Sequence, residues 1–186
     1  LWVGWFGFNG GSQLAADAGA AMALTVTHLS AATASLTWAF WEKVKYGKSS
    51  LVGLVTGTIA GLASITPASG FVGPIEAIII GGIAGILCQE AVKIVRETFK
   101  IDDTLDVFAV HGVGGIFGII MIPVLSFLGF ENGSSWIAQI VSLAVVGLYT
   151  LVLTVIIIKF LSLFMNFRVD KESEYEGLDI TAHGER

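Results

Sequence analysis

The stretch Asp106-Val-Phe-Ala-Val-His111-Gly-Val-Gly-Gly115 begins a long apolar segment, and this segment indicates whether the chain folds in water or in a membrane. From Val107 to Phe130, His111 is the only ionisable side chain. At a rise of about 1.5 Å per residue, a helix of this length crosses the ~30 Å hydrocarbon core of a bilayer. An imidazole there needs a partner, because burying an unpaired polar group costs roughly 2–7 kcal/mol. Intramembrane ionisable residues commonly line a path for an ion, a proton or a substrate, so His111 is the first candidate functional residue.

The composition agrees with a membrane environment. The chain of 186 residues is 54% hydrophobic and only 13% charged, with a mean hydropathy of +0.81, which excludes an ordinary soluble domain. Its 23 glycines suit close helix packing in lipid. The single cysteine, Cys88, excludes a disulfide framework and a multi-thiolate metal site. No metal site and no cofactor are expected, and the few dispersed basic residues do not indicate a nucleic-acid partner.

The basic residues predict the topology. All Lys and Arg residues fall in three segments, residues 43–48, 93–100 and 159–186, whereas the intervening connectors carry the acids Asp17, Glu76 and Glu131. The positive-inside rule places the basic segments in the cytoplasm, together with the C-terminus, in a multi-pass protein of the plasma or inner membrane. The expected spans are roughly 1–14, 18–42, 50–68, 73–96, 104–128 and 135–165.

The first expected span is too short to cross a bilayer. It begins at Leu1 with no methionine and no signal-peptide pattern, so we expect the chain to be the C-terminal part of a longer transporter-like protein. The predicted fold class is all-α, a polytopic transmembrane helical bundle with about five and a half transmembrane helices. Residues 1–167 form the membrane part, and residues 168–186 form a cytoplasmic tail.

Aromatic residues gather at the outer end of the first span. Trp5 and Phe8 present ring faces, which attract cations by roughly 0.5–2 kcal/mol, and the hydroxyl of Ser12 can accept a hydrogen bond. The alternative is an interfacial aromatic belt that ends in a glycine turn.

Three further positions have a structural and a functional interpretation. We favour His28 as a buried histidine that bonds a neighbouring helix, over a residue of a pathway. Thr66 opens the Thr66-Pro67 break, which is either an outer turn or a broken helix end that exposes carbonyls to a cavity. Asp106 is the expected cap of the helix that carries His111, and for His111 itself we favour a pathway role over packing.

Five stretches together resemble the ammonium transporter (Amt/MEP/Rh) family. They are Gly4-Trp-Phe-Gly-Phe-Asn9-Gly-Gly-Ser12, Thr27-His28-Leu29, Thr66-Pro-Ala-Ser-Gly70, Asp106-Val-Phe-Ala-Val-His111-Gly and Glu176-Gly-Leu-Asp-Ile-Thr-Ala-His-Gly184. The likeness runs through the whole chain and covers the family's C-terminal half, from the sixth helix to the tail. Trp5 and Ser12 favour the Amt branch over an Rh-type gas channel.

The resemblance implies a homotrimer with one pore in each protomer. Trp5, Phe8 and Ser12 match residues that recruit ammonium at an outer vestibule. Leu1, Ile59 and Val107 match apolar pore-lining residues, and His111 matches the second of two facing pore histidines. Asn9, His28, Thr66 and Asp106 belong to the motifs as structural positions. Members often carry Asn before the Thr-His pair, where this chain has Val26. Recruitment as NH4+ and passage past His111 as NH3 is the implied mechanism.

The tail from Arg168 onward changes character. Its charged composition favours disorder, whereas the resemblance implies a tail that packs on the cytoplasmic face and contributes to a surface for PII-type signalling proteins. Gly177, Asp179 and, with a weaker match, His183 are the residues concerned. An ammonium sensor that signals through this tail is the alternative to a transporter. An enzyme is not expected, since the chain shows no nucleophile–base pairing and no nucleotide-binding glycine loop.

Overall fold

The computed structural model describes residues 1–130 and 135–184, so Glu131 and Arg186 lie outside the described residues. Every regular element in the described ranges is a helix. The chain divides into two compact units, Leu1–Leu143 and Ala144–Arg186. The all-α prediction is therefore confirmed.

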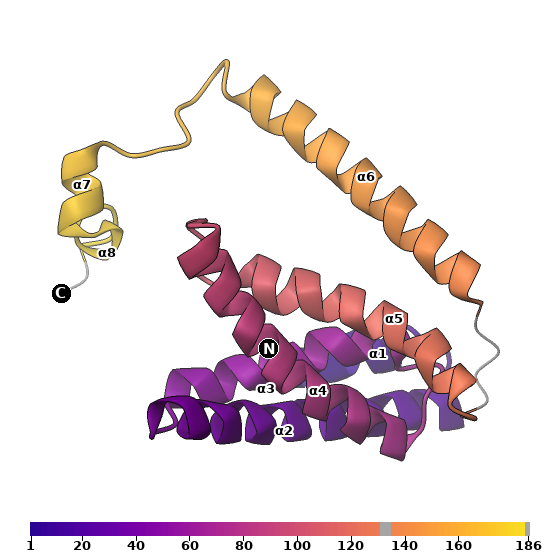
Figure 1. The fold of residues 1–186 in the computed structure, drawn as a ribbon. Coiled ribbons are helices and arrows are strands. Elements are labelled where there is room, and N and C mark those ends of the chain that lie inside the picture. Colours follow the sequence, from indigo (N-terminus) through magenta and orange to yellow (C-terminus); the bar gives the residue numbers. More distant parts are fainter. Residues whose placement is uncertain (131–134, 185–186) are drawn as a thin grey trace. The chain divides into compact units, whose positions relative to one another are not determined.

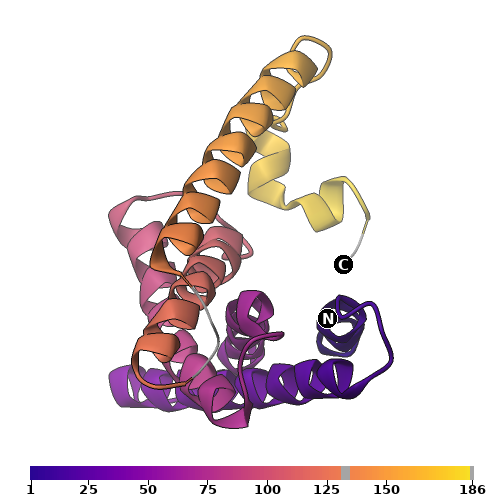
Figure 2. The same ribbon diagram turned by 90° about the vertical axis from the view of Figure 1, so that its right-hand side faces the viewer.

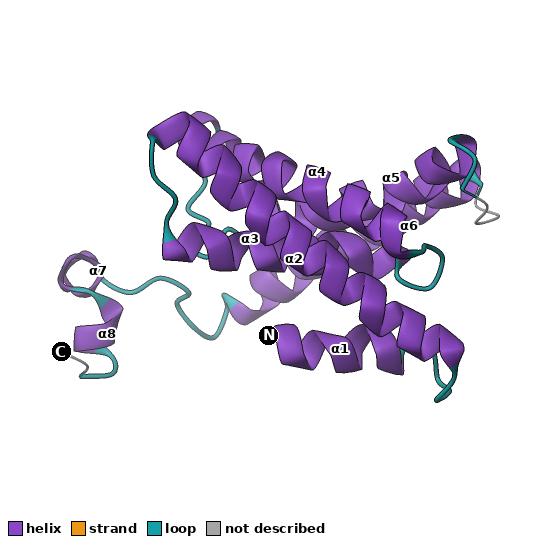
Figure 3. Ribbon diagram, turned by 90° about the horizontal axis from the view of Figure 1, so that it is seen from below, coloured by secondary structure: helices purple, strands orange, loops and turns teal. Residues whose placement is uncertain are grey.

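The first unit is built around one long helix. α2 (Ala18–Tyr46) packs against α1 (Trp2–Gly11), α3 (Leu51–Ile65) and α4 (Pro74–Lys93), as Figures 1 and 3 show. α1, drawn in indigo, lies against the first part of α2 (Figure 2). α5 (Val113–Phe127) contacts α3 and α4. Three short elements complete the unit: η1 (Thr66–Ala68), η2 (Ile94–Thr98) and η3 (Phe108–Gly112).

Side-chain caps set the starts of two helices. The Asp17 carboxylate accepts the Ala20 N–H at 3.1 Å at the start of α2, which satisfies one of the free N–H groups of the first turn. The Ser50 hydroxyl accepts the Gly53 N–H at 2.9 Å at the start of α3. α2 ends at Gly47, whose φ of +78° reverses the chain direction without the steric cost that a Cβ would bring.

The backbone of α2 at Ser30 lies between two glycines of neighbouring helices. A Cβ built at Gly61 of α3 would lie 2.4 Å from the Ser30 carbonyl oxygen, and one built at Gly81 of α4 would lie 2.3 Å from the same atom. The Ser30 hydroxyl donates to the Gly61 carbonyl at 2.9 Å. These contacts confirm the expectation that glycines provide close helix approach.

A buried apolar cluster joins α2, α3, α4 and α5. Its fully buried members include Val26, Ile65, Ile80 and Leu125. Val26, the position at which family members often carry Asn, is completely buried there. An amide at that position would need a hydrogen-bond partner inside this cluster, so valine fits the packing of this chain.

Four helical segments are long and apolar enough to cross a membrane: Leu51–Ala68, Pro74–Thr98, Phe108–Phe127 and Trp136–Leu161. They match four of the expected spans. α2 has 29 residues and extends to Tyr46, beyond the predicted end at residue 42. Its many Ala, Ser and Thr residues make its mean hydropathy lower than that of the four segments named above. α1 has only 10 residues, so it is the half-length helix that the sequence predicted.

α6 (Trp136–Leu161) contains the boundary between the two units, and none of its residues is buried. In the second unit, the chain after α6 forms α7 (Lys171–Glu176) and α8 (Leu178–Thr181). The Asp170 carboxylate caps α7 by accepting the N–H of Ser173 at 2.9 Å, and Arg168 pairs with Glu174. The preference for disorder from composition was therefore wrong, because local capping and pairing support two short helices.

Candidate functional site

Trp5 anchors α1 to the outer turn through its indole. Its Nε1–H donates to the Thr66 hydroxyl oxygen at 2.8 Å, and the same hydroxyl donates to the Leu62 carbonyl at 2.7 Å. Thr66 therefore accepts from α1 while it bonds its own helix. Thr66 begins η1, where Pro67 ends the α-helical ladder of α3. The Thr66 carbonyl in turn accepts the Ser69 hydroxyl, which supports the interpretation of this break as a turn.

Asn9, one helical turn after Trp5, makes an equivalent bond to α2. Its Nδ2 donates to the Thr27 hydroxyl oxygen at 2.9 Å, and Thr27 donates to the Ala23 carbonyl at 2.6 Å. Asn9 is only 4% exposed. The sequence marked Asn9 as structural but did not identify Thr27 as its partner, because i, i+4 spacing on α1 does not reveal the register against α2. Together the two hydrogen bonds fix the position of α1 along its axis and its rotation about that axis.

The anchored face of α1 meets His111 at a pocket of about 470 Å³, lined by Leu1, Gly4, Trp5, Phe8 and His111. The Trp5 and His111 ring centroids are 5.7 Å apart, and those of Trp5 and Phe8 are 5.9 Å apart. Within the described residues, neither nitrogen of the exposed His111 imidazole makes a hydrogen bond. The partner that an intramembrane imidazole requires is therefore not supplied by this part of the molecule.

His111 lies in a π-helical turn, η3, and not in the regular α-helix that the sequence predicted. Such turns are frequent at functional sites. The expected cap is also different: the Asp103 carboxylate, not that of Asp106, accepts the N–H groups of Val107 and Phe108 at 2.9 and 2.8 Å. The prediction that Asp106 caps this helix was wrong, because Asp106 has φ +54° and its carboxylate binds Arg96.

Asp106 forms a two-point ion pair with Arg96 of η2. Arg96 Nε and one terminal nitrogen donate to the two carboxylate oxygens at 2.6 and 2.8 Å. A positive φ at a non-glycine residue is uncommon and needs support from its surroundings. The bidentate pair supplies that support, and it ties the end of the α4–η2 segment to the start of the turn that carries His111.

The remaining expected pore and recruitment residues lie outside the Trp5–His111 pocket. Val107 is more than half exposed, one turn before His111. Ile59 is half-buried and packs against a buried cluster that includes Trp38 and Val110. Ser12 is exposed, donates its hydroxyl to the Phe8 carbonyl at 2.6 Å, and lines a different pocket together with Asn9 and Thr66. Their roles in a pathway stay predictions.

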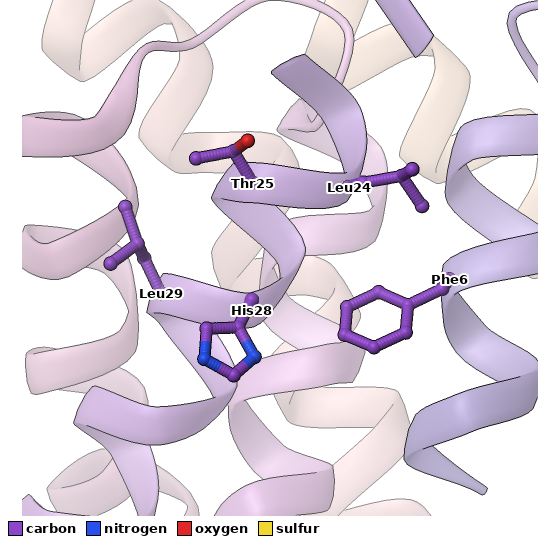
Figure 4. A pocket seen from close by; sticks show the side chains of 5 residues that line it. All are labelled: Phe6, Leu24, Thr25, His28 and Leu29. Atoms are coloured by element: carbon purple, nitrogen blue, oxygen red, sulfur yellow. The ribbon is translucent and has the colours of Figure 1, made fainter. Parts of the chain in front are cut away.

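His28 lies on the other side of α1, in a separate pocket of about 450 Å³. Figure 4 shows its imidazole and the Phe6 ring facing each other from neighbouring helices, with ring centroids 6.1 Å apart. The Trp2 ring is closer, at 5.2 Å. The favoured interpretation of His28 as a buried, hydrogen-bonded histidine was wrong: it is exposed and contacts aromatic rings. The hydrophobic residues that flank His28 in the sequence do not determine which face of α2 is covered by other helices.

Metal chemistry finds no support in the described ranges, where no group of three His, Cys, Asp or Glu side chains could hold an ion. In the tail, Gly177 has φ +102° and joins α7 to α8. Asp179 lies in the first turn of α8, where a carboxylate favours the positive end of the helix, and His183 follows that helix. The regulatory role expected for these three residues stays a prediction.

Comparisons with known proteins place these features in one family. The model of the Ammonium Transporter Family matches residues 1–186. The ammonium transporter Amt1 of Archaeoglobus fulgidus is 42% identical over all of this chain and 49% of its own length. The ammonium transporter of Bacillus subtilis is 39% identical over all of this chain and 48% of its own length.

Solved structures agree. A structure described as "Sensor Amt Protein" matches 97% of this chain and 46% of its own chain, with a TM-score of 0.85 and 34% identity. Mep2 of Candida albicans matches 93% of this chain and 42% of its own, with a TM-score of 0.79 and 34% identity. The chain spans about half the length of these relatives. The chain belongs to the ammonium transporter family.

Proposed function

We propose that the full-length protein transports ammonium across the membrane, recruiting NH4+ on its outer side and passing NH3 beside His111. The observation that carries this proposal is the meeting of Trp5, Phe8 and His111 around one pocket, although the histidine lies some hundred residues after the aromatic pair. The family match and the names of the relatives support ammonium as the substrate.

The aromatic pair suits a cation, and the histidine suits a neutral molecule. Trp5 and Phe8 attract NH4+ through their ring faces, and Ser12 Oγ adds an acceptor, since its proton is donated to the Phe8 carbonyl. Deeper in the bilayer a charge costs at least ~2.5–3.5 kcal/mol, whereas NH3 carries none. A neutral imidazole has one N–H donor and one acceptor nitrogen, so His111 can bond NH3 in either sense.

The apolar residues would complete the path. Leu1 lines the same pocket as His111, and Val107 presents a largely exposed side chain one turn away. Together with Ile59, these side chains would exclude water and thereby favour the uncharged form of the substrate.

The assembly and the membrane orientation follow the same proposal. No residue of α6 is buried, and its exposed side chains are mostly apolar, which suits contact with lipid or with neighbouring protomers of a homotrimer. We propose a multi-pass protein of the plasma or inner membrane with a cytoplasmic C-terminus, as the positive-inside rule requires. The tail with Gly177 and Asp179 would provide the surface for a PII-type signalling protein.

The test is ammonium-induced current and internal pH change in proteoliposomes that contain the full-length protein. His111→Ala should abolish the response or its selectivity. His28→Ala is the matched control, because His28 is also an exposed histidine beside aromatic rings, but outside the Trp5 pocket. A His111→Ala protein with unchanged current and selectivity would refute the role of His111 in the pathway.

An ammonium sensor is the second candidate function. It is favoured by the similarity in fold to the structure described as a sensor Amt protein. A sensor would bind ammonium without translocating it, so wild-type proteoliposomes would give neither a sustained current nor a pH change while ammonium binding remained measurable.

A further inference from the structure

Three helices enclose a second polar pocket, near the basic last turns of α2 and α4. Two glycines let α3 and α4 close on Trp38 of α2: a Cβ built at Gly57 would lie 2.5 Å from the Trp38 Cβ, and one built at Gly85 would lie 3.0 Å from its backbone nitrogen. One turn further along α2 and α4 come Glu42 and Gln89. Both line a cavity of about 300 Å³, which we call the Glu42–Gln89 pocket.

The side chain of Gln89 has an unpaired buried oxygen. Gln89 is only 9% exposed, and its Oε1 accepts no hydrogen bond from any residue that the structure describes. Buried polar atoms in folded proteins are nearly always paired, so this oxygen needs an explanation. The terminal torsion of a glutamine side chain is soft, so the amide can turn toward an occupant of the pocket. Gln89 therefore favours an occupant that donates a hydrogen bond or coordinates oxygen.

The nearby hydroxyl groups are also acceptors. Ser50 donates its proton to the Glu42 carboxylate at 3.0 Å, and Thr56 donates to the Val52 carbonyl at 2.8 Å. A hydroxyl has one proton and two lone pairs, so neither offers a donor to a ligand unless it gives up its bond. Gly53 leaves room for the carboxylate, since a Cβ there would lie 2.6 Å from Glu42 Oε2.

The charges that line the pocket leave one carboxylate without a counter-ion. Arg96 is held by the two-point pair with Asp106, and Lys93 lies 4.0 Å from Glu97. Glu42 takes part in none of the ion pairs of the described ranges, and its oxygens accept only from neutral donors. Because Glu42 is half-buried, its charge favours a cation beside it.

An occupant that suits this lining is small, carries one positive charge and is satisfied by oxygen acceptors. A multivalent metal ion fits less well, because no group of three His, Cys, Asp or Glu side chains in the described ranges could hold one. We propose that the Glu42–Gln89 pocket binds a small monovalent cation, with the Glu42 carboxylate and the Gln89 amide oxygen as its principal ligands. Potassium and ammonium share this chemistry. The pocket is separate from that of Trp5 and His111, so the proposal does not depend on transport.

The direct test is X-ray diffraction from crystals of the full-length protein soaked in thallous ion, a monovalent cation similar in size to potassium and ammonium. We expect an anomalous peak in the Glu42–Gln89 pocket that excess potassium or ammonium displaces and excess choline does not. Displacement by ammonium alone would identify ammonium as the occupant, and displacement by both would identify a general monovalent site. No peak in this pocket, or a peak that neither cation displaces, would overturn the proposal.

A pair of glutamate variants provides the second test. Glu42→Gln removes the charge, and Glu76→Gln is its control, because Glu76 is also half-buried but lies in the first turn of α4, outside the pocket. The measurement is thermal unfolding of the full-length protein in detergent, with choline chloride replaced stepwise by the chloride of the cation that displaces thallium. A ligand that binds only the folded state raises the unfolding temperature.

The wild type and Glu76→Gln should show the same rise in unfolding temperature. In Glu42→Gln the cation concentration needed for a given rise should increase about tenfold, because an interaction with a charged ligand is lost. Absence of a rise in the wild type, or an undiminished response in Glu42→Gln, would overturn the proposal. Each variant is compared with itself in choline, so a change in its basal stability does not affect the result.

Gln89→Leu tests the amide without a change of charge. Replacing an unpaired buried polar group by an apolar group of similar size is close to neutral or stabilising, so this variant should unfold in choline at or above the temperature of the wild type. Its response to the cation should nevertheless weaken about tenfold. A full response would show that the amide oxygen is not a ligand and would overturn the proposal.

The cation site and the transport function can fail separately. Ammonium-induced current in the wild type with no thallium peak in the Glu42–Gln89 pocket would refute the cation site alone. A displaceable peak in a protein that gives neither current nor pH change would support the site and refute transport.

Discussion

Replacing Gly81 by alanine should separate α4 from α2. A Cβ at Gly81 would lie 2.3 Å from the Ser30 carbonyl oxygen and 2.8 Å from its Cα, whereas non-bonded heavy atoms prefer about 3.5–4.0 Å. The obstructing atoms belong to the backbone of α2, so no side-chain rotation relieves the clash. α4 would have to move outward by about 1 Å, past a backbone that Gly61 approaches from α3.

The expected cost follows from this geometry. Overpacking a tightly packed interior costs typically ~1–3 kcal/mol, and a clash with backbone belongs at the upper end. Alanine recovers up to ~1 kcal/mol of helix propensity, which leaves a net destabilisation of about 2 kcal/mol for Gly81→Ala. At Gly82 a Cβ would lie 3.7 Å from the nearest atom, a methyl group of Thr33. Gly82→Ala should therefore be neutral or slightly stabilising.

The assay is unfolding of the full-length protein in mixed micelles with increasing dodecyl sulfate, followed by circular dichroism. Gly81→Ala should unfold at a lower detergent fraction than the wild type, and the two alanine variants should differ by about 3 kcal/mol. Equal stability of the Gly81 and Gly82 variants would refute the close approach of α4 to Ser30.

The other predictions concern single hydrogen bonds. Trp5→Phe removes the bond to Thr66 and should cost about 1 kcal/mol in the same unfolding assay. Trp2→Phe should not incur this hydrogen-bond loss, because the Trp2 Nε1 is buried without a partner in the described residues; an equal cost for both would count against the anchoring role. Asp103→Ala should destabilise by about 1 kcal/mol through loss of the cap of η3, and the result would contradict this assignment if amide exchange in η3 did not accelerate. Hydrogen bonds from Ser173 hold the pKa of Asp170 below the ordinary 3.8, so its contribution to α7 is present above pH 3.8 and is lost as the pH falls through the lower folded value. An NMR titration of the Asp170 carboxyl should give a midpoint below 3.8, and a midpoint at or above 3.8 would refute the cap.

Hydropathy and charge were sufficient to predict the helical membrane fold, because burial in lipid acts on whole segments. The uncharged run after Asp106 forms a helix long enough to span a membrane, and Gly61 of α3 and Gly81 of α4 lie where helices pack closely, as the glycine content suggested. The tail was mispredicted because its helices depend on the pairing of Arg168 with Glu174 and on the Asp170 cap, and average composition does not record such local bonds.

At the candidate site, too, some features were predictable from the sequence and others depended on the tertiary structure. The sequence by itself identified Trp5, Phe8 and His111 as chemically unusual, since aromatic rings and an imidazole stand out in an apolar chain. Only the tertiary structure brought the histidine within 5.7 Å of the indole, assigned the cap to Asp103, and turned His28 toward Trp2 and Phe6. The physical reason is that residue chemistry is a local property, whereas the rotation of one helix against another depends on bonds such as Trp5–Thr66 and Asn9–Thr27, which join distant parts of the chain.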